Sequence, residues 1–271
     1  MDAPASPAVD IATAVRRGET SAVRVVEAHL DAIAAGAALN AFTAIDAERA
    51  LERASSLDIA VAAGGDPGPL AGVPVALKDL IDHQGRVTTC GSGFYRETPD
   101  RSATIVERIE EAGGIIIGRT GLHEFAFGFS SENPWFGPVR NPWDPATSPG
   151  GSSGGSGAAV AAGMAPLGVG TDTGGSVRVP AAMCGIAGLK VTHGRIPLTG
   201  VFPLASSIDT VGPLARSAAD LALLYGVMAG HDTRDPWSDS RPVPMPDRDR
   251  EVAGLRVAMP AEWLDTCLLY T

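Results

Sequence analysis

The sequence predicts an α/β fold in which a mixed, largely parallel β-sheet is surrounded by helices. Amphipathic segments at helical spacing alternate with short apolar runs of strand length. The stretch ATIVERIEEAGGIIIGRT (103–120) contains one such unit, because a helical pattern stops at two glycines and a run of isoleucines follows. Apolar residues make up 45% and charged residues 19% of the 271 residues, a composition typical of a globular protein with a sizeable core.

Helices and strands follow from the spacing of apolar residues and from their caps. Helical spacing predicts helices over 10–19, 20–36, 46–65, 103–112, 156–163 and 217–230. Thr20, Asp46 and Ser217 are the expected N-caps, because their side-chain oxygens can accept hydrogen bonds from the free N–H groups at the start of a helix. Gly36 is the expected end of the second helix, because glycine readily adopts the backbone conformation that terminates a helix. Short apolar runs predict strands over 40–46, 73–77, 115–119, 164–172 and 255–260. The segment 232–250, rich in proline and aspartate, is either a linker or a surface loop.

Charge, hydropathy and cysteine usage exclude several classes of protein. The net charge of −10 argues against a nucleic-acid backbone as a direct partner, because phosphate binding needs a basic surface. No apolar run approaches the roughly 20 residues of a membrane-spanning helix, and the first residues lack the pattern of a secretory signal. Cys90, Cys184 and Cys267 are too few and too far apart for a disulfide framework or a zinc site. We therefore expect a cytoplasmic location, no membrane contact, and no metal or other cofactor.

The end of the sequence departs from the pattern of the rest. EWLDTCLLYT stops without a cap or a turn, and its last five residues resemble the translation of a sequencing-library adapter. We expect residues 1–266 to form a single domain that is incomplete at its C-terminus, and residues 267–271 to be a non-native tail.

Lysine is rare in this chain, which makes its two lysines informative. The 21 basic residues comprise 19 arginines and only Lys78 and Lys190. Arginine stays protonated in proteins, whereas a buried lysine can lose its proton and act as a base. Lys78 directly follows the apolar run VPVAL, where a charge exposed to solvent is less natural. Lys78 is therefore a candidate base, and we interpret Lys190 as structural.

The stretch SPGGSSGGSG (148–157) has the composition of a flexible linker, but an alanine-rich helical segment follows it at once. A nucleotide-phosphate loop is excluded because no G-x-x-x-x-G-K-[ST] pattern is present. G-x-S-x-G occurs around Ser152 and Ser153, yet prolines occupy the place of the strand that a nucleophile elbow needs. His123 and His193 are the candidate histidine partners for such a serine, and nothing in their spacing selects either.

A serine paired with lysine is the remaining possibility. A serine hydroxyl is a weak nucleophile and needs a neighbouring base, which a desolvated neutral lysine can supply. In GTDTGGSVRVP, Ser176 follows two glycines and opens an expected helical segment. Successive N–H groups in such a turn can converge as an oxyanion hole. Asp172 and Arg178 flank the turn and are expected to brace it as an ion pair; the alternative is that both are surface charges.

The block Gly150–Arg195, with GVPVALKDLID and GRTGLHEFAFGFSSENPWFGPVRNPWD upstream of it, resembles the amidase signature family in composition and order. The resemblance covers nearly the whole chain. It implies the amidase signature fold and a Ser–Ser–Lys triad made of Ser176 as nucleophile, Ser152 as bridging serine after a cis peptide bond, and Lys78 as base. It also implies an oxyanion hole from the backbone of Thr173, Gly174, Gly175 and Ser176. Ser153, Asp172 and Arg178 are expected to hold the triad residues and the glycine turn in position.

The family includes broad amidases and the glutamine-hydrolysing A subunit of tRNA-dependent amidotransferases. In that subunit the block continues as Ile-Arg-Gln-Pro, whereas this chain has Val177-Arg178-Val179-Pro180, which favours a stand-alone amidase. We expect a small-molecule amide substrate, and either a homodimer or, for the subunit, amidotransferase partners. A non-catalytic scaffold stays open as a third alternative. Ala126, Phe127 and Gly128, within EFAFGF, are candidates for the substrate pocket; the alternative is that the rings of this segment pack in the core.

Overall fold

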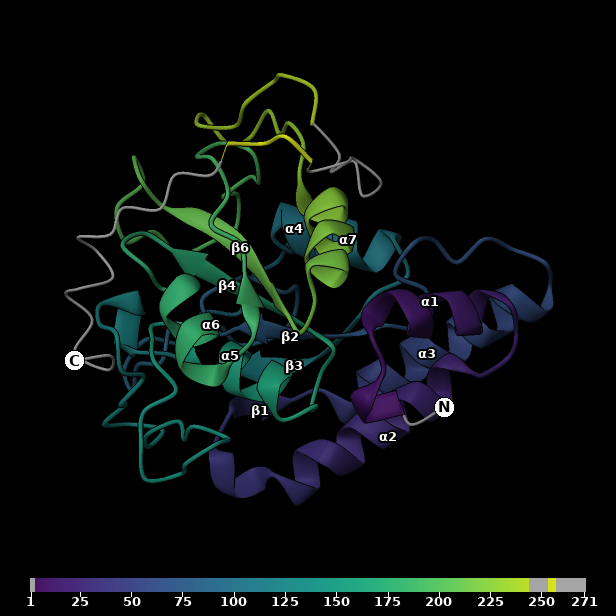
Figure 1. Ribbon diagram of the computed structural model, residues 1–271, viewed down its shortest axis with the longest axis horizontal. Helices are drawn as coiled ribbons and strands as arrows, with labels where there is room; N and C mark the ends of the chain where they lie inside the picture. The colour runs from purple at the N-terminus through teal and green to yellow at the C-terminus, as the bar shows by residue number, and fades with distance from the viewer. Residues whose placement is uncertain (1–2, 244–252, 257–271) are drawn as a thin grey trace.

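The computed structural model describes residues 3–243 and 253–256. Within them, one six-stranded sheet has the strand order β1-β3-β2-β4-β6-β5 (Figure 1). The strands are β1 (Phe42–Ile45), β2 (Pro74–Lys78), β3 (Ile115–Thr120), β4 (Leu167–Asp172), β5 (Ala187–Gly188) and β6 (Thr210–Ala215). β2 pairs in parallel with β3 and β4, whereas β1–β3, β4–β6 and β5–β6 are antiparallel. The predicted mixed α/β sheet is confirmed, but it is not largely parallel: only the pairings among β3, β2 and β4 are parallel, and the outer strands β1, β6 and β5 all add in antiparallel orientation.

Helices surround the sheet in the described part of the chain. They are α1 (Ala8–Arg16), α2 (Ala22–Ala35), α3 (Ala47–Ala62), α4 (Thr104–Glu111), α5 (Gly154–Ala161), α6 (Arg178–Cys184) and α7 (Ala218–Met228), with short 3-10 turns η1 (Ala3–Ala5), η2 (Ala37–Leu39) and η3 (Glu124–Ala126). Figure 1 shows α1, α2 and α3 together at one end of the molecule. Helix α5 packs against β2, β3, β4 and β6 with α6 beside it, and α7 packs against β6 and α4.

Glycines in β4 allow helix α5 to lie directly on the sheet. Side chains alternate between the two faces of a strand, so Gly168 and Gly170 point to the same face. A Cβ atom at Gly168 would lie 3.1 Å from Val160 Cγ2 of α5, and one at Gly170 would lie 2.6 Å from Ser153 Oγ. The missing side chains therefore bring the start of α5, and the serines before it, against the carboxyl half of β4.

Most predicted elements are confirmed, and capping residues determine where several of the helices begin and end. Ser217 caps α7 by accepting a hydrogen bond from Asp220 N at 3.1 Å, and Gly36 ends α2. The predicted N-cap at Thr20 is wrong, because Ser21 directly precedes the helix and accepts from Arg24 N at 3.1 Å. Asp46 occupies the N-cap position of α3, but its carboxylate pairs with Arg86 at 3.1 Å and makes no capping hydrogen bond.

Other boundaries shift, and two strands were not predicted. The helix expected over 156–163 begins two residues earlier, at Gly154, and the helical segment expected from Ser176 begins at Arg178. Strands β5 and β6 were missed, because β6 contains Gly212 and Pro213 and lacks a clear apolar alternation. Most of the strand expected over 255–260, and the whole of 267–271, lie outside the described residues.

The described part of the proline- and aspartate-rich segment, residues 232–243, is a loop packed onto the domain. Asp232 accepts a hydrogen bond from Thr104, and Asp235 accepts one from Leu198 N at 2.8 Å. It therefore behaves as a surface loop rather than as a linker. No helix in the described ranges is both long and apolar enough to cross a membrane.

Candidate active site

The serine- and glycine-rich stretch 148–157 is buried against the sheet, in contrast to its linker-like composition. Ser152 and Ser153 are fully buried, and the Gly151–Ser152 peptide bond is cis. A Cβ atom at Gly151 would lie 2.8 Å from the backbone nitrogen of Ser131, so only glycine fits there. Close packing, against backbone at Gly151 and Gly155 and against the side chain of Ser131 at Gly154, accounts for the glycines of this segment rather than flexibility.

Lys78 is the last residue of β2, and its side chain ends among hydroxyl groups in the interior. Its side chain is completely buried, and Nζ lies 2.8 Å from Ser152 Oγ and 2.8 Å from Thr171 Oγ1. Burial lowers the pKa of Lys78 from 10.5 to about 7, and the charges of Asp172 and Asp209 oppose this shift only in part. A substantial fraction of the amine is therefore neutral near pH 7, as a base must be.

Ser176 lies in the turn between β4 and α6, next to the buried serines. It is 4% exposed, and its carbonyl oxygen accepts a hydrogen bond from Ser153 N at 3.2 Å. Among the described residues, no group is hydrogen-bonded to the Ser176 hydroxyl or to the N–H groups of Gly174, Gly175 and Ser176. A row of unpaired N–H groups beside a free hydroxyl leaves room for a ligand oxygen.

The ion pair expected across this turn is present and bidentate. Arg178 Nε and Nη2 each donate to a different oxygen of Asp172, both at 2.9 Å. Asp172 also accepts from the N–H groups of Val177 and Arg178, at 3.2 and 3.3 Å. Burial opposes ionisation of Asp172, but the hydrogen bonds from Arg178 and Val177 lower its pKa overall. The carboxylate therefore fixes the path of the chain from β4 through Ser176 into α6.

Ser153 fastens the serine loop to the end of β4. Its hydroxyl accepts from Thr171 N at 3.2 Å and donates to Thr171 O at 3.3 Å. Thr171 Oγ1 also accepts a hydrogen bond from Lys78 Nζ. Ser153 therefore positions Thr171, and Thr171 in turn positions the amine of Lys78. Thr171 was not among the residues selected from the sequence, although it stands at the start of TDTGGS beside the residues that were selected.

Asp209 is a second residue that sequence reasoning missed. It is 6% exposed, accepts from the hydroxyl of Thr173, and accepts from the N–H groups of Leu204 and Ala205 at 2.9 and 2.8 Å. It thereby ties the 204–206 loop to the first residue of the turn. No local signal points to it, because it lies 36 residues after Thr173.

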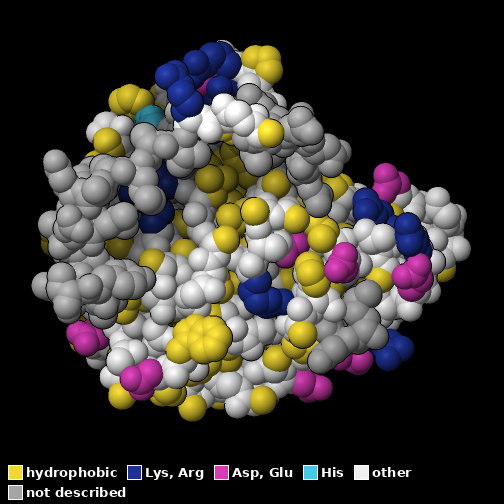
Figure 2. All heavy atoms as spheres, in the orientation of Figure 1, with side chains coloured by type: hydrophobic (Ala, Val, Ile, Leu, Met, Phe, Trp, Pro, Cys, Tyr) yellow, Lys and Arg dark blue, Asp and Glu magenta, His cyan; other side chains and the backbone are white. Residues whose placement is uncertain are grey.

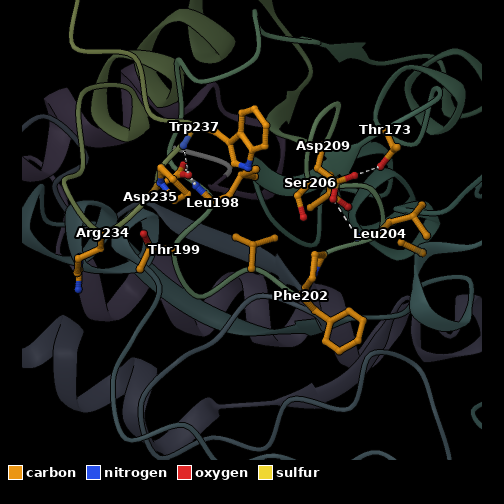
Figure 3. A pocket seen from close by; sticks show the side chains of 15 residues that line it. Thr173, Leu198, Thr199, Phe202, Leu204, Ser206, Asp209, Arg234, Asp235 and Trp237 are labelled. Atoms are coloured by element: carbon orange, nitrogen blue, oxygen red, sulfur yellow. Dashed lines mark hydrogen bonds between the residues drawn. The ribbon is translucent and has the colours of Figure 1, made fainter.

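A cavity of about 230 Å³ opens beside these groups (Figure 3). Thr171 and Thr173 form its edge toward Lys78 and the turn, and Leu198, Leu204 and Trp237 supply apolar walls. Of the residues expected in a substrate pocket, Ala126 lines it, whereas Phe127 and Gly128 are not among the described lining residues.

The aromatic rings expected near the pocket diverge. Phe127 is 78% and Phe129 57% exposed, while Phe125 packs against Tyr95 and Phe202 with ring centroids 6.0 and 5.5 Å away. Positive φ at Phe125 (49°) turns the chain so that successive rings point in different directions. Packing in the core, the alternative considered for these rings, therefore applies to Phe125.

Metal-ligating residues do not cluster at this site. Within the described ranges, no group of three or more His, Cys, Asp or Glu side chains is arranged to hold a metal ion. His123 Nδ1 lies 3.4 Å from Ser130 Oγ, and His193 Nε2 lies 3.0 Å from the carbonyl oxygen of Ser206, so within the described ranges neither imidazole is hydrogen-bonded to a candidate serine. The contact of His123 with Ser152 is a backbone hydrogen bond, from His123 N to Ser152 O at 3.1 Å.

Comparison with known proteins identifies relatives over most of the chain. Residues 24–267 match the family model described as Amidase. The A subunit of a glutamyl-tRNA(Gln) amidotransferase from Chromohalobacter salexigens is 48% identical over 258 residues, covering 94% of this chain and 53% of the relative. The chain thus spans about half the length of the curated relatives it matches.

Solved structures give the same picture. A chain from a complex described as a vestigial protein complex that reveals the evolutionary origins of an s-triazine catabolic enzyme matches with a TM-score of 0.87 and 44% identity, over 89% of this chain and 53% of that one. A peptide amidase from Stenotrophomonas maltophilia matches with a TM-score of 0.84 and 36% identity, over 88% and 50%.

Proposed function

This chain belongs to the amidase family, and from that premise we propose that the protein containing it hydrolyses a carboxylic amide through an acyl-enzyme on Ser176. One observation carries the proposal: a fully buried lysine, with a pKa lowered to about 7 by burial, lies 2.8 Å from the hydroxyl of Ser152. A buried amine without an anionic partner in contact is costly, and such groups are typical of catalytic sites.

In the proposed first half-reaction, neutral Lys78 takes the proton of Ser152 while Ser152 takes that of Ser176. The oxygen of Ser176 forms a bond to the amide carbon, and the carbonyl electrons move to an oxyanion that the unpaired N–H groups of Gly174, Gly175 and Ser176 stabilise. The C–N bond then breaks, and the relay returns the proton to the leaving nitrogen as Ser176 becomes an ester.

In the second half-reaction, water takes the place of the leaving amine. The relay removes a proton from the water as its oxygen attacks the ester carbon, and the same N–H groups hold the second oxyanion. Collapse of this intermediate releases the carboxylic acid and returns the proton to Ser176. No cofactor is required, since every proton and electron pair is exchanged among substrate, water and these three residues. Ser153, Asp172 and Arg178 are proposed to hold the serines and the turn in place.

A fluorophosphonate probe tests the assignment of the nucleophile, because it forms a stable bond with activated serine hydroxyls. We expect the purified protein that contains this sequence to be labelled, and labelling to be lost in Ser176→Ala. Ser207→Ala is the matched control, because this exposed serine lies outside the site. Undiminished labelling of Ser176→Ala would refute the nucleophile.

A second candidate function is that of an amidotransferase A subunit, which hydrolyses glutamine for partner subunits. The 48% identity to the Chromohalobacter salexigens relative favours it. Val179, which packs beside Gly175 where that subunit carries glutamine, favours the stand-alone amidase. The second candidate would be supported if genes for the other amidotransferase subunits lie next to the gene for this protein and if those subunits co-purify with the protein.

The remaining assignments are also proposals. We propose that residues 1–266 belong to one domain and that the substrate is a small molecule. The protein is proposed to act in the cytoplasm, as a homodimer or, for the second candidate, with amidotransferase partners.

A further inference from the structure

We propose that the cavity beside Thr171 and Thr173 receives the amine side of the substrate, so that the preferred substrates are N-substituted amides whose amine component is apolar and carries no negative charge. This inference rests on the proposed function, because the cavity has a substrate side only if Lys78, Ser152 and Ser176 act as described. It adds a substrate class that distinguishes the protein from an enzyme for primary amides such as glutamine.

The position of the cavity next to Lys78 and Ser152 assigns it to the leaving group of the substrate. In the proposed reaction the leaving nitrogen must meet the Ser152–Lys78 relay that protonates it. Thr171, whose Oγ1 lies 2.8 Å from Lys78 Nζ, is also a wall of the cavity. A substituent on the leaving nitrogen therefore points from the relay past Thr171 into this space, while the carbonyl oxygen lies against the N–H groups of the turn.

The size and walls of the cavity fit a ring or a short alkyl chain. Its volume of about 230 Å³ exceeds the roughly 150 Å³ of an apolar engineered cavity that binds benzene. Leu198 and Trp237 approach it from one side and Leu204 from the other (Figure 3). In the orientation of Figure 2, hydrophobic side chains gather over the central part of this face, and acidic side chains lie mostly toward its right-hand and lower edges. Transfer of an apolar group from water into such a space is favourable.

Charge at the cavity excludes an anionic amine component. Asp209 and Asp235 both line it and are both 6% exposed. Asp209 is held by Thr173 and two backbone N–H groups, and Asp235 by two backbone N–H groups; within the described ranges neither forms an ion pair. Arg234 also lines the cavity, but its guanidinium pairs with Asp232 and Glu107. Because these two carboxylates have no ion-pair partner among the described residues, they repel a carboxylate on the amine, as in an N-acyl amino acid, and favour the leaving amine once it is protonated.

Three amides that share a butyryl group test this inference: butyramide, N-benzylbutyramide and N-butyrylglycine. We expect kcat/KM for N-benzylbutyramide to exceed that for butyramide by about tenfold or more, as burial of a phenyl ring allows. N-butyrylglycine is expected to be the poorest of the three.

Substitutions in the 204–208 loop locate the effect. Leu204→Asp adds a charge to the wall and is expected to reduce the ratio of kcat/KM for N-benzylbutyramide over butyramide by about tenfold or more. Ile208→Asp is the matched control, because this side chain is 54% exposed and is not among the cavity residues. Its ratio should equal that of the wild type. If Leu204→Asp does not fold, the ratio of kcat/KM for N-benzylbutyramide over butyramide in the wild type still tests the inference.

The outcomes separate this inference from the proposed function. If butyramide is hydrolysed as well as or better than N-benzylbutyramide, or if Leu204→Asp folds and leaves the ratio unchanged, the inference is overturned while the amidase function stands. If no amide is hydrolysed and Ser176 is not labelled by the fluorophosphonate, the proposed function itself fails.

Discussion

Replacing Lys78 with methionine should abolish activity and yet remove a pH-dependent loss of stability. Methionine has a similar length but no charge. In the folded protein the pKa of Lys78 is about 7, because the side chain is buried, against 10.5 when exposed. Each unit of difference corresponds to 1.36 kcal/mol, so below pH 7 this lysine lowers the free energy of unfolding by about 5 kcal/mol.

The sign of the pH dependence follows from proton uptake. Between pH 7 and 10.5 the unfolded chain holds a proton on Lys78 that the folded chain has released. The destabilisation therefore shrinks as pH rises, and the wild type should gain about 2 kcal/mol relative to Lys78→Met between pH 7 and 9. The variant leaves the hydroxyls of Ser152 and Thr171 without their amine partner, which costs about 1 kcal/mol each at any pH in this range.

Thermal unfolding of both proteins at pH 7 and pH 9 measures the effect. At about 2–4 °C per kcal/mol, the difference in Tm between wild type and Lys78→Met should change by about 4–8 °C between the two pH values. Lys190→Met is the matched control, since it removes the other lysine from a site that is partly exposed. Parallel pH dependences of the wild type and Lys78→Met would refute the lowered pKa and, with it, the neutral base.

Two further predictions concern the same site. In the wild type, kcat/KM should rise with pH through a pKa of about 7 and then level off, because only neutral Lys78 accepts a proton; a pH-independent profile between 5 and 9 would contradict this assignment. Asp172→Asn should lower the free energy of unfolding by about 1–3 kcal/mol near pH 7, because Arg178 is left with a neutral partner. That loss should shrink as pH falls from 3.8 toward the lower pKa of the folded state, because the unfolded wild-type chain then takes up a proton on Asp172 that the folded chain does not hold; chemical denaturation across this range checks it, with a constant loss as the contrary result.

Several features of the site were accessible from the sequence because they depend on residue type and local order. Lys78 stood out since lysine is rare in this chain and this one follows an apolar run. Asp172 and Arg178 flank the glycine turn closely enough in sequence for their ion pair to be expected. Ser176 was a candidate nucleophile from its place after two glycines, whereas Ser152 was assigned as the bridging serine only through the family resemblance, because composition alone made SPGGSSGGSG a linker.

Other features had no local signal. Strand β6 contains glycine and proline and is a strand because it pairs with β4, a choice made by neighbours rather than by propensity. Asp209 reaches the turn from 36 residues away, and the lysine and Ser152 that meet at 2.8 Å are 74 residues apart. The direction of each ring in EFAFGF depends on the backbone angles of a single turn, which residue type does not determine.

By itself, then, the sequence determined the fold class, most helices and strands, and the residue types available for chemistry, because periodicity, caps and composition act over a few residues. The tertiary structure alone decided that the most linker-like stretch is buried against β4, that Thr171 and Asp209 join the predicted site, and that a cavity with both apolar and acidic walls lies beside them. It did so because burial, pKa and hydrogen bonding depend on groups brought together across the chain, which no local pattern records.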